Sequence, residues 1–346
     1  MASWSEILSR LVDGQDLATA DTRWIMDQIL NGEATAVPMA AFLAGLRVKG
    51  ETPAEVEGLV DAMLEHAVKI SVPVRSVDLV GTGGDGANTV NITTMASLVV
   101  AGAGLTVVKH GNRAASSTTG SSDVLSELGI NLAASPERVA ELATEVGITF
   151  CPAPVFHSSM RYVGPIRAEL GIATTFNILG PLTNPAQPES SAIGASSPVL
   201  APVIAGVLAR KRRNGLVFRG GDGLDELAAT APSSVWEVRD GQIDEFTLNA
   251  VTQLGLPAIE TADLKGGDAQ YNASVVHRVM DGDQGAVRDT VLLNAAAGIV
   301  ADATLPGTAD GAFVDRMRVA LELAREAVDS GAAADVLSRW TAASNT

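Results

Sequence analysis

The chain has 346 residues, of which 47% are hydrophobic and 18% are charged, and its formal net charge is −16. This length predicts about two domains around a large core. So acidic a chain is a poor partner for nucleic acid, whose phosphates must be neutralised by cations. The single cysteine, Cys151, and four histidines without zinc-ligand spacing exclude a disulfide framework and a zinc site.

The N-terminal segment MASWSEILSRLVDG carries an early acidic residue and lacks the continuous apolar core of a signal peptide. The longest weakly polar run, residues 95–108, is too short to span a bilayer and contains two glycines. We therefore expect a cytoplasmic protein without a membrane segment.

Residues 1–72 show only the helical spacing of apolar side chains. Before the clearest stripe, Thr52-Pro53-Ala54-Glu55 supplies an N-cap, a proline at the first helical position and a capping-box glutamate. We expect a helical domain here, and its apolar stripes favour internal packing over a subunit interface. The clearest stripe comprises Val56, Leu59, Val60, Met63 and Leu64.

Two strand-loop-helix units follow between Val77 and Gly129. In the first, VDLV leads through the loop 81–91 into an apolar helix at 92–103 that Asn91 or Thr93 could cap. In the second, LTVVK leads through the loop 110–123 into a short helix at 124–129. Free N–H groups and the positive end of the helix dipole would face each loop. This chemistry suits a phosphate or pyrophosphate group.

Strands and helices continue to alternate from Ser135 onward, which predicts an α/β domain over 73–346 with a central, mostly parallel sheet flanked by helices. Ligands bind at the carboxyl ends of the strands in such folds. We expect the region of about 157–188 to return to the helical domain. The expected elements are a helix from Ser135, a strand at 147–151, a helix at 157–171 interrupted at Gly164-Pro165, short helical pieces at 173–188, a strand at 191–196, a helix at 200–212, a strand at 215–220, a hairpin at 233–248 turning at Asp240-Gly241, and helices at 268–280, 284–301 and 309–329.

The loop GTGGDG is a weak signal alone, since it matches neither a Walker motif nor a dinucleotide fingerprint. Its combination with later motifs is specific, and the set resembles the anthranilate phosphoribosyltransferase family over nearly the whole chain. The later motifs are KHGNR at 109–113, a Ser/Thr-Gly loop at 116–122, HSSMRYVGPIRAELG at 157–171, FNILGPLTNP at 176–185, GLDE at 223–226 and GGDAQYNA at 266–273.

The resemblance implies transfer of a phosphoribosyl group from phosphoribosyl diphosphate to the amine of anthranilate, in tryptophan biosynthesis, with Mg²⁺ as cofactor. It also implies a homodimer formed through the helical domain. We expect the reaction to take place in a cleft between the two domains. The residues that it implies for phosphoribosyl diphosphate are Gly81, Gly84, Asp85, Thr89, Asn91, Ile92, Thr93 and Thr94 in the first loop and helix start, and Lys109, His110, Gly111, Asn112, Arg113, Ala114, Ala115, Ser116, Ser117 and Ser121 in the second loop, with Lys109 as a point charge.

For anthranilate the resemblance implies Gly81, Asn112 and Arg167, whose guanidinium fits a carboxylate in bidentate fashion. A helix C-terminal arginine that caps carbonyl groups is the alternative interpretation of Arg167, and Arg161 lies close enough in sequence to be confused with it.

The resemblance implies Thr93, Asp225 and Glu226 as magnesium ligands. Adjacent carboxylates suit a hard cation, although acidic residues also favour a helix start without any metal. We expect His110 and His157 to position or pack other groups rather than act as general bases, and the sequence assigns no residue as acid or base.

Three departures from the family pattern stand out. Thr93 replaces the usual serine at the metal, residues 117–120 read Ser-Thr-Thr-Gly, and Arg219 replaces a histidine before GLDE. Two other functions have less support. A pyrimidine nucleoside phosphorylase is disfavoured because its KHSTGG pattern is absent, and the charge opposes a non-catalytic relative that binds nucleic acid.

Overall fold

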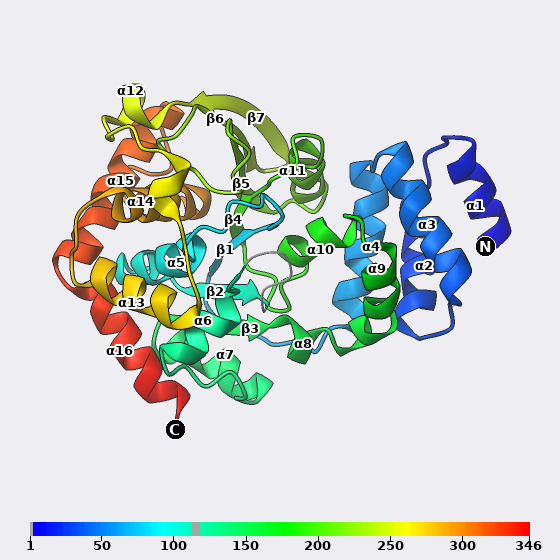
Figure 1. Ribbon diagram of the computed structural model, residues 1–346, viewed down its shortest axis with the longest axis horizontal. Helices are drawn as coiled ribbons and strands as arrows, with labels where there is room; N and C mark the ends of the chain where they lie inside the picture. The colour runs from blue at the N-terminus through cyan, green and yellow to red at the C-terminus, as the bar shows by residue number, and fades with distance from the viewer. Residues whose placement is uncertain (1–2, 113–117) are drawn as a thin grey trace.

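The computed structural model describes residues 3–112 and 118–346. It consists of a helical part, which carries the N-terminus at its far end, and a larger α/β part, which carries the C-terminus (Figure 1). The expected fold class is therefore confirmed. None of the described helices has the length and hydropathy that crossing a bilayer would require.

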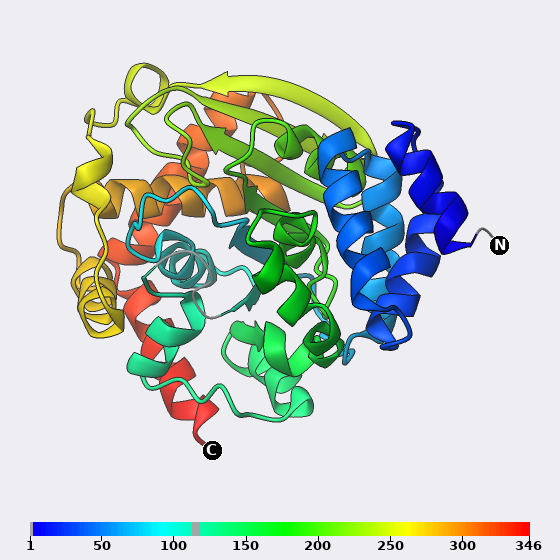
Figure 2. The ribbon, with the colours of Figure 1, turned by 45° about the vertical axis from the view of Figure 1, so that its right-hand side comes forward.

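The helical part is built from the first four helices, which stand side by side, and from a later segment that packs against them (Figure 2). The capping box is confirmed: Thr52 Oγ1 accepts a hydrogen bond from the Glu55 N–H at 3.3 Å, and Glu55 Oε2 accepts one from the Thr52 N–H at 2.8 Å. The helices are α1 (Trp4–Val12), α2 (Thr19–Leu30), α3 (Ala36–Lys49) and α4 (Pro53–His66), followed later by α8 (Ala153–Phe156), η1 (Ser158–Tyr162), α9 (Gly164–Leu170) and α10 (Phe176–Leu182).

The α/β part contains a seven-stranded sheet in the order β3-β2-β1-β4-β5-β6-β7. The first five strands are parallel, and β6 and β7 form the expected antiparallel hairpin. Its turn residues Asp240 and Gly241 have φ of 51° and 82°, as a tight hairpin turn requires. The strands are β1 (Val77–Gly81), β2 (Val107–Gly111), β3 (Ile148–Pro152), β4 (Ser190–Gly194), β5 (Asn214–Gly220), β6 (Ser233–Arg239) and β7 (Gln242–Leu248).

Helices cover both faces of the sheet, and α10 and α11 lie between the sheet and α4 (Figure 1). The remaining elements are α5 (Ile92–Gly102), α6 (Ser121–Glu127), α7 (Pro136–Glu145), α11 (Leu200–Arg210), α12 (Ala250–Leu254), η2 (Thr261–Leu264), α13 (Ala269–Met280), α14 (Ala286–Asp302), α15 (Phe313–Asp329) and α16 (Ala332–Ser344).

The two faces of the sheet belong to two separate cores, because successive residues of a strand point to opposite sides. Leu79 and Leu216 pack in one core with α5 and α14. The next residue of each strand, Val80 and Val217, packs in a second core that includes α4 and α11. The helical part therefore shares its core with one face of the sheet, which fixes its position relative to the strand ends.

Several element boundaries differ from the sequence expectations. Asn91 occupies the N-cap position of α5, but its side chain makes no capping bond. Helix α6 begins at Ser121, three residues before the expected start, and Gly164 and Pro165 begin α9 instead of interrupting a longer helix. Helix α16 was not expected, although Ala333, Val336, Leu337 and Trp340 have helical spacing and are buried.

Candidate functional site

The sheet has a point at which its strand order reverses, between β1 and β4. From β1 the chain proceeds to β2 and β3 on one side, and from β4 it proceeds to β5 on the other. The strands end together, since Gly81 of β1 pairs with Gly194 of β4. The loops that leave these ends diverge, and such a divergence leaves room for a ligand.

Three carboxylates, from the loops after β1 and β5, meet at these carboxyl ends of the strands. One oxygen of each of Asp85, Asp225 and Glu226 lies within 4.8 Å of the others. Asp225 Oδ2 accepts a hydrogen bond of 2.7 Å from the N–H of Gly83, and Glu226 Oε1 accepts one of 3.3 Å from Thr89 Oγ1. The loop after β5 is thus bonded to the Gly-rich loop after β1. We expected Asp85 to contact the substrate, and the structure adds it to the carboxylate group.

Burial makes this carboxylate group electrostatically unfavourable without a cation. Asp225 and Glu226 are 7% and 8% exposed, and burial, together with the charges of the neighbouring carboxylates, raises the pKa of both. Glu226 Oε2 is buried and has no hydrogen-bond partner among the described residues. A hard divalent cation with oxygen ligands would relieve both problems, so the residues present fit Mg²⁺.

The glycines at the strand ends are required by close approach to Asp225. A Cβ atom on Gly81 would collide with the Asp225 carboxylate, and one on Gly194 would collide with the Asp225 carbonyl group. In the loop itself, Gly84 has a φ of +86°, in the region that favours glycine. These positions allow the carboxylate group to sit directly against the end of the sheet.

The expected substrate residues at the start of α5 differ in their exposure, and so in their accessibility to a ligand. Ile92 and Thr94 are 1% and 2% exposed, so the Ile92 side chain belongs to the core. Thr93 is half-buried. Both polar atoms of the Asn91 side chain already hydrogen-bond to other residues of the chain.

The second loop is described only in part, because Arg113, Ala114, Ala115, Ser116 and Ser117 lie outside the described residues. Lys109, in β2 directly before the loop, is 2% exposed, and its ammonium donates to the carbonyl oxygen of Leu79. Burial lowers the pKa of Lys109 to about 8. The expected point charge therefore lies inside the sheet, beside the buried Asp78, whose charge favours the protonated lysine.

On either side of residues 113–117, Asn112 and the start of α6 contact each other. Ser121 Oγ donates to the carbonyl oxygen of Asn112 at 3.2 Å, and the N–H of Ser122 donates to the same oxygen. A Cβ atom on Gly111 would lie 2.5 Å from Ser121 Oγ. The family motif thus places a glycine where the end of β2 touches the start of α6.

His110 and His157 lie against each other, with ring centroids 5.2 Å apart. His110 Nδ1 donates to the Gly180 carbonyl group and His157 Nε2 to that of Thr183, each at 2.9 Å. Burial, followed by the charge of His157, lowers the pKa of His110 to about 3, and burial also lowers the pKa of His157. Both rings are held by backbone carbonyl groups near α10, which supports a positioning role.

Arg167 and Arg161 differ in their availability to a ligand. Within the described part of the chain, the guanidinium of Arg167 has no hydrogen bond or ion pair, and it lies 5.2 Å from the centre of the Phe176 ring. Burial lowers the pKa of Arg167, although a guanidinium remains charged at neutral pH. Arg161 instead donates to the hydroxyl of Tyr162 at 2.9 Å. The side chain of Arg167 is therefore free to meet a ligand, whereas that of Arg161 is already engaged.

Sequence reasoning missed Ser196, in the loop after β4. Ser196 Oγ donates to the carbonyl oxygen of Gly83 at 2.8 Å, and its N–H donates to Thr82 Oγ1 at 3.1 Å. Arg219, which departs from the family pattern, donates through Nε to the Ser196 carbonyl group at 2.9 Å. The guanidinium of Arg219 therefore supports the first loop through Ser196. The sequence contained no signal for this role of Ser196, which stood only as a serine at the end of an expected strand.

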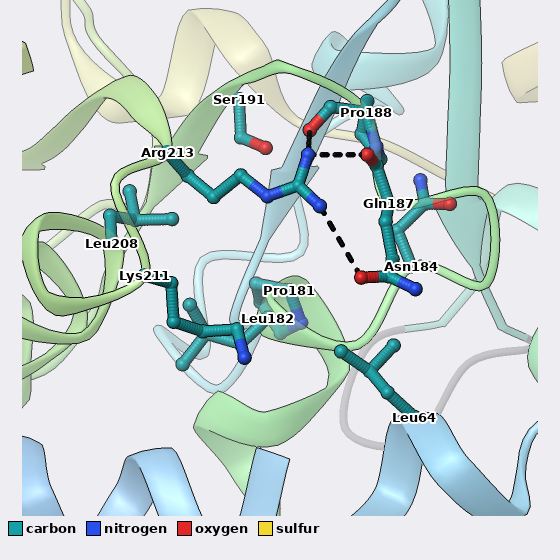
Figure 3. A pocket seen from close by; sticks show the side chains of 10 residues that line it. All are labelled: Leu64, Pro181, Leu182, Asn184, Gln187, Pro188, Ser191, Leu208, Lys211 and Arg213. Carbon is teal, nitrogen blue, oxygen red and sulfur yellow. Dashed lines mark hydrogen bonds between the residues drawn. The ribbon is translucent and has the colours of Figure 1, made fainter. Parts of the chain in front are cut away.

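A small pocket lies at the opposite, amino-terminal ends of the strands, before the starts of β4 and β5 (Figure 3). Leu64 and Leu182 line one side, and Arg213 lines the other while it donates to the carbonyl groups of Gln187 and Pro188. Its cavity of about 40 Å³ has room for a few water molecules. This pocket is too small for either expected substrate.

Comparisons with known proteins agree with the site. Residues 5–67 match the helical bundle domain of a glycosyl transferase family, and residues 74–334 match its a/b domain. The anthranilate phosphoribosyltransferase of Streptomyces griseus is 54% identical over 343 residues, which cover 99% of this chain and 96% of the relative. That of an Arthrobacter species is also 54% identical, over 340 residues that cover 98% of this chain and 96% of the relative.

Solved structures show the same likeness. The anthranilate phosphoribosyltransferase of Thermus thermophilus has a TM-score of 0.90 and 39% identity, with 98% of this chain and 99% of that chain covered. The Saccharomyces cerevisiae enzyme in complex with phosphoribosyl diphosphate and Mg has a TM-score of 0.87 and 26% identity, with 99% of this chain and 98% of that chain covered.

Proposed function

The chain belongs to the anthranilate phosphoribosyltransferase family of glycosyl transferases, and from this premise we propose how its residues carry out the reaction. The enzyme transfers the phosphoribosyl group of phosphoribosyl diphosphate to anthranilate, a step of tryptophan biosynthesis. A bond forms between the anthranilate nitrogen and C1 of the ribose. The bond from C1 to the diphosphate oxygen breaks, diphosphate leaves with the electron pair, and the nitrogen loses one proton.

The observation that carries the assignment of roles is the group formed by Asp85, Asp225 and Glu226 against the Gly-rich loop. Asp225 and Glu226, with the hydroxyl of Thr93, would hold Mg²⁺, and Asp85 is close enough to join them. When bound, Mg²⁺ neutralises charge on the leaving diphosphate. The Saccharomyces cerevisiae relative has been solved with phosphoribosyl diphosphate and Mg, which supports this choice of cation.

The chain's own part in phosphate binding is a cradle of backbone N–H groups. Gly84 would let the backbone approach the ligand, because little occupies the position of its Cβ atom. Helix α5 turns the positive end of its dipole toward the same loop. The residues from Lys109 to Ser117, together with Ser121, would hold the other anionic end of the substrate. The buried ammonium of Lys109 would act on that loop from inside the sheet.

Arg167 would bind the carboxylate of anthranilate, because it is the partly buried arginine whose guanidinium is uncommitted among the described residues. A planar guanidinium and a carboxylate form two parallel hydrogen bonds, which orients the aromatic ring and its amine. The buried ring of Phe176 packs against this guanidinium and helps to hold it in place. Asn112 and Gly81 would contact anthranilate from the phosphoribosyl diphosphate side.

The decisive experiment mixes the chain with anthranilate, phosphoribosyl diphosphate and Mg²⁺ and follows the loss of anthranilate fluorescence. We expect turnover, with diphosphate released in equal amount. A parallel reaction with a pyrimidine nucleoside and phosphate should give no nucleobase, since phosphorylase activity is the alternative. Phosphorolysis without consumption of anthranilate would contradict the assignment.

We also propose a homodimer formed through the helical part. Val12 at the end of α1 and Val48 near the end of α3 are 86% and 88% exposed, and a second copy would cover them. A cytoplasmic location remains our proposal as well. It is supported by the multiply charged substrate, which does not cross membranes, and by the single cysteine.

A further inference from the structure

The motif GGDAQYNA supplied part of the family resemblance but no site residue, and in the structure it lies against both Gly-rich loops. Residues 264–272, here called the bridging segment, run beside the end of the first loop. The Val90 N–H donates to the Leu264 carbonyl group at 2.9 Å, and the Gly266 N–H donates to the Asn88 carbonyl group at 2.8 Å. Thr89 and Lys265 form an isolated antiparallel bridge.

Gly266 is required by this approach, and Gly267 by the turn of the bridging segment into α13. A Cβ atom on Gly266 would lie 2.6 Å from the carbonyl oxygen of Thr89, and one on Gly267 would lie 2.9 Å from the ring of Tyr271. Asp268 then caps α13 by accepting from the Tyr271 N–H at 2.8 Å. One turn into that helix lies Asn272, whose side chain is nearly completely buried.

Four hydrogen bonds form a closed ring through three segments. Asn272 Nδ2 donates to Asn91 Oδ1 at 2.8 Å, and Asn91 Nδ2 donates to the Thr119 carbonyl oxygen at 3.1 Å. Thr119 Oγ1 donates to the Gly267 carbonyl oxygen at 2.8 Å, and the Gly267 N–H donates to Asn272 Oδ1 at 2.9 Å. The ring joins the end of the first loop, the end of the second loop and the bridging segment.

A second link between the two loops lies close to the ring. Asn88 has a φ of +52°, and its Oδ1 accepts hydrogen bonds from both the N–H and the hydroxyl of Thr118, at 3.2 and 3.3 Å. Its own carbonyl group binds the bridging segment at Gly266. The relative position of the two loops is therefore set through the bridging segment as well as by the sheet.

We propose that Asn272 is a positioning residue that holds the side chain of Asn91 and so fixes the two loops at the separation that phosphoribosyl diphosphate requires. The proposal rests on the proposed function, in which the loops hold the two anionic ends of one substrate. In this arrangement Asn91 acts through its position, because both polar atoms of its side chain are already bonded within the ring. An error of about 1 Å in such a geometry can cost up to about a hundredfold in rate.

The test compares Asn272→Ala, Asn272→Asp and Thr119→Val with the control Asn249→Ala. The control also removes an asparagine amide with two hydrogen bonds, both accepted from backbone N–H groups at the N-cap of α12, away from the two loops. We expect the first three to raise the KM for phosphoribosyl diphosphate by roughly tenfold. The KM for anthranilate at saturating phosphoribosyl diphosphate should stay unchanged. Asn272→Asp keeps the size of the side chain and the acceptor for Gly267, so it supplies the measurement if the alanine variant does not fold.

A double-mutant cycle separates this role from general stability. If Asn91 and Asn272 act as a pair, the KM of the variant with both replaced by Ala should equal that of either single variant. Additive effects, a parallel rise of both KM values, or a wild-type KM for phosphoribosyl diphosphate in Asn272→Asp would each overturn the proposal.

Calorimetric binding of phosphoribosyl diphosphate with Mg²⁺, without anthranilate, distinguishes a failure of the ring proposal from a failure of the proposed function. If wild-type chain binds this ligand but does not consume anthranilate, the acceptor assignment fails, while weaker binding by Asn272→Asp than by wild type still supports the ring. If wild type and Asn272→Asp bind equally well, the ring proposal fails and the proposed function stands.

Discussion

Arg167 and Arg161 belong to adjoining helices of one sequence motif, yet only Arg161 has a hydrogen bond to another described side chain. Replacing Arg167 by Ala should raise the KM for anthranilate by roughly ten- to a hundredfold, because a charge-assisted bidentate contact is lost. Steady-state kinetics with varied anthranilate would measure this change. Arg161→Ala is the matched control and should remain within about twofold of wild type. The reverse order of effects would show that the wrong arginine was assigned.

Because of Asp225 and Glu226, turnover should depend on Mg²⁺, and the folded chain should be less stable when Mg²⁺ is absent. In the double variant Asp225→Asn, Glu226→Gln, turnover should fall by at least about a hundredfold, since the residues proposed to hold the cation are lost. Thermal melting adds an independent measurement. Mg²⁺ should raise the Tm of wild type but not of the variant, because only wild type binds the ion. Wild-type turnover by the variant would remove both residues from the metal site.

Asp78 should give the chain a pH-dependent stability. Its carboxylate accepts hydrogen bonds from the N–H of His110 and the side chain of Asn184, but burial, the largest effect, raises its pKa to about 6. Between about pH 4 and pH 6 the folded chain holds a proton that the unfolded chain has released, so the contribution of Asp78 to the free energy of unfolding falls as pH rises. The total loss is on the order of 3 kcal/mol.

Urea unfolding of wild type and Asp78→Asn at several pH values would measure this effect. The decrease between pH 4 and pH 6 should be smaller in the variant, in which Asp225 and Glu226, whose pKa values are also raised, still contribute. The difference in free energy of unfolding between wild type and variant should be constant above about pH 7. An equal pH slope in both proteins would mean that Asp78 titrates normally.

The cap of α4 offers a comparison between two helix starts. Thr52→Ala should lower the free energy of unfolding by about 1 kcal/mol, because the hydroxyl accepts the Glu55 N–H. Thr35 occupies the N-cap of α3 without a side-chain capping bond, so Thr35→Ala should change the free energy of unfolding much less. Denaturant unfolding would measure both variants, and neither should alter the KM values. Equal losses would show that the capping bond contributes nothing.

Local signals in the sequence predicted most elements because they depend on neighbours in the chain. The capping box at Thr52, the hairpin turn at Asp240-Gly241 and the Gly-rich ends of β1 and β2 are all such signals. The start of α6 was predicted too late, because Gly120 replaces a side-chain cap and Asp123 accepts its N–H from inside the helix. Helix α16 was missed although its apolar spacing was present.

Site features that depend on distant parts of the chain could not be predicted from the residues alone. The family resemblance pointed to Gly81 and Asp225 as substrate and metal residues, but it did not indicate that they contact each other. In the structure, the Asp225 carboxylate occupies the space that a Cβ atom on Gly81 would need. The resemblance also placed Lys109 in the cradle, whereas the structure buries its ammonium in the sheet. The ring through Asn91 and Asn272 joins residues that lie far apart in sequence, and no spacing rule predicts such a contact.

The assembled molecule should be a homodimer if the exposed valines of the helical part are covered by a second copy. Sedimentation equilibrium should give twice the mass of one chain, and Val12→Asp with Val48→Asp should give the monomer, because charges do not tolerate burial in an apolar interface. Val319→Asp, on α15 of the α/β part, is the control and should remain dimeric. A monomeric wild type, or a dimer that survives both charges, would contradict this interface.

The central claim is that one site at the carboxyl edge of the sheet brings phosphoribosyl diphosphate and a divalent cation together between the loops after β1 and β5. A crystal soaked with phosphoribosyl diphosphate and Mn²⁺ in place of Mg²⁺ tests this claim most directly through the anomalous scattering of manganese. We predict an anomalous peak within bonding distance of carboxylate oxygens of Asp225 and Glu226, with the diphosphate on its other side. A bound diphosphate whose metal lies away from both carboxylates would contradict the account.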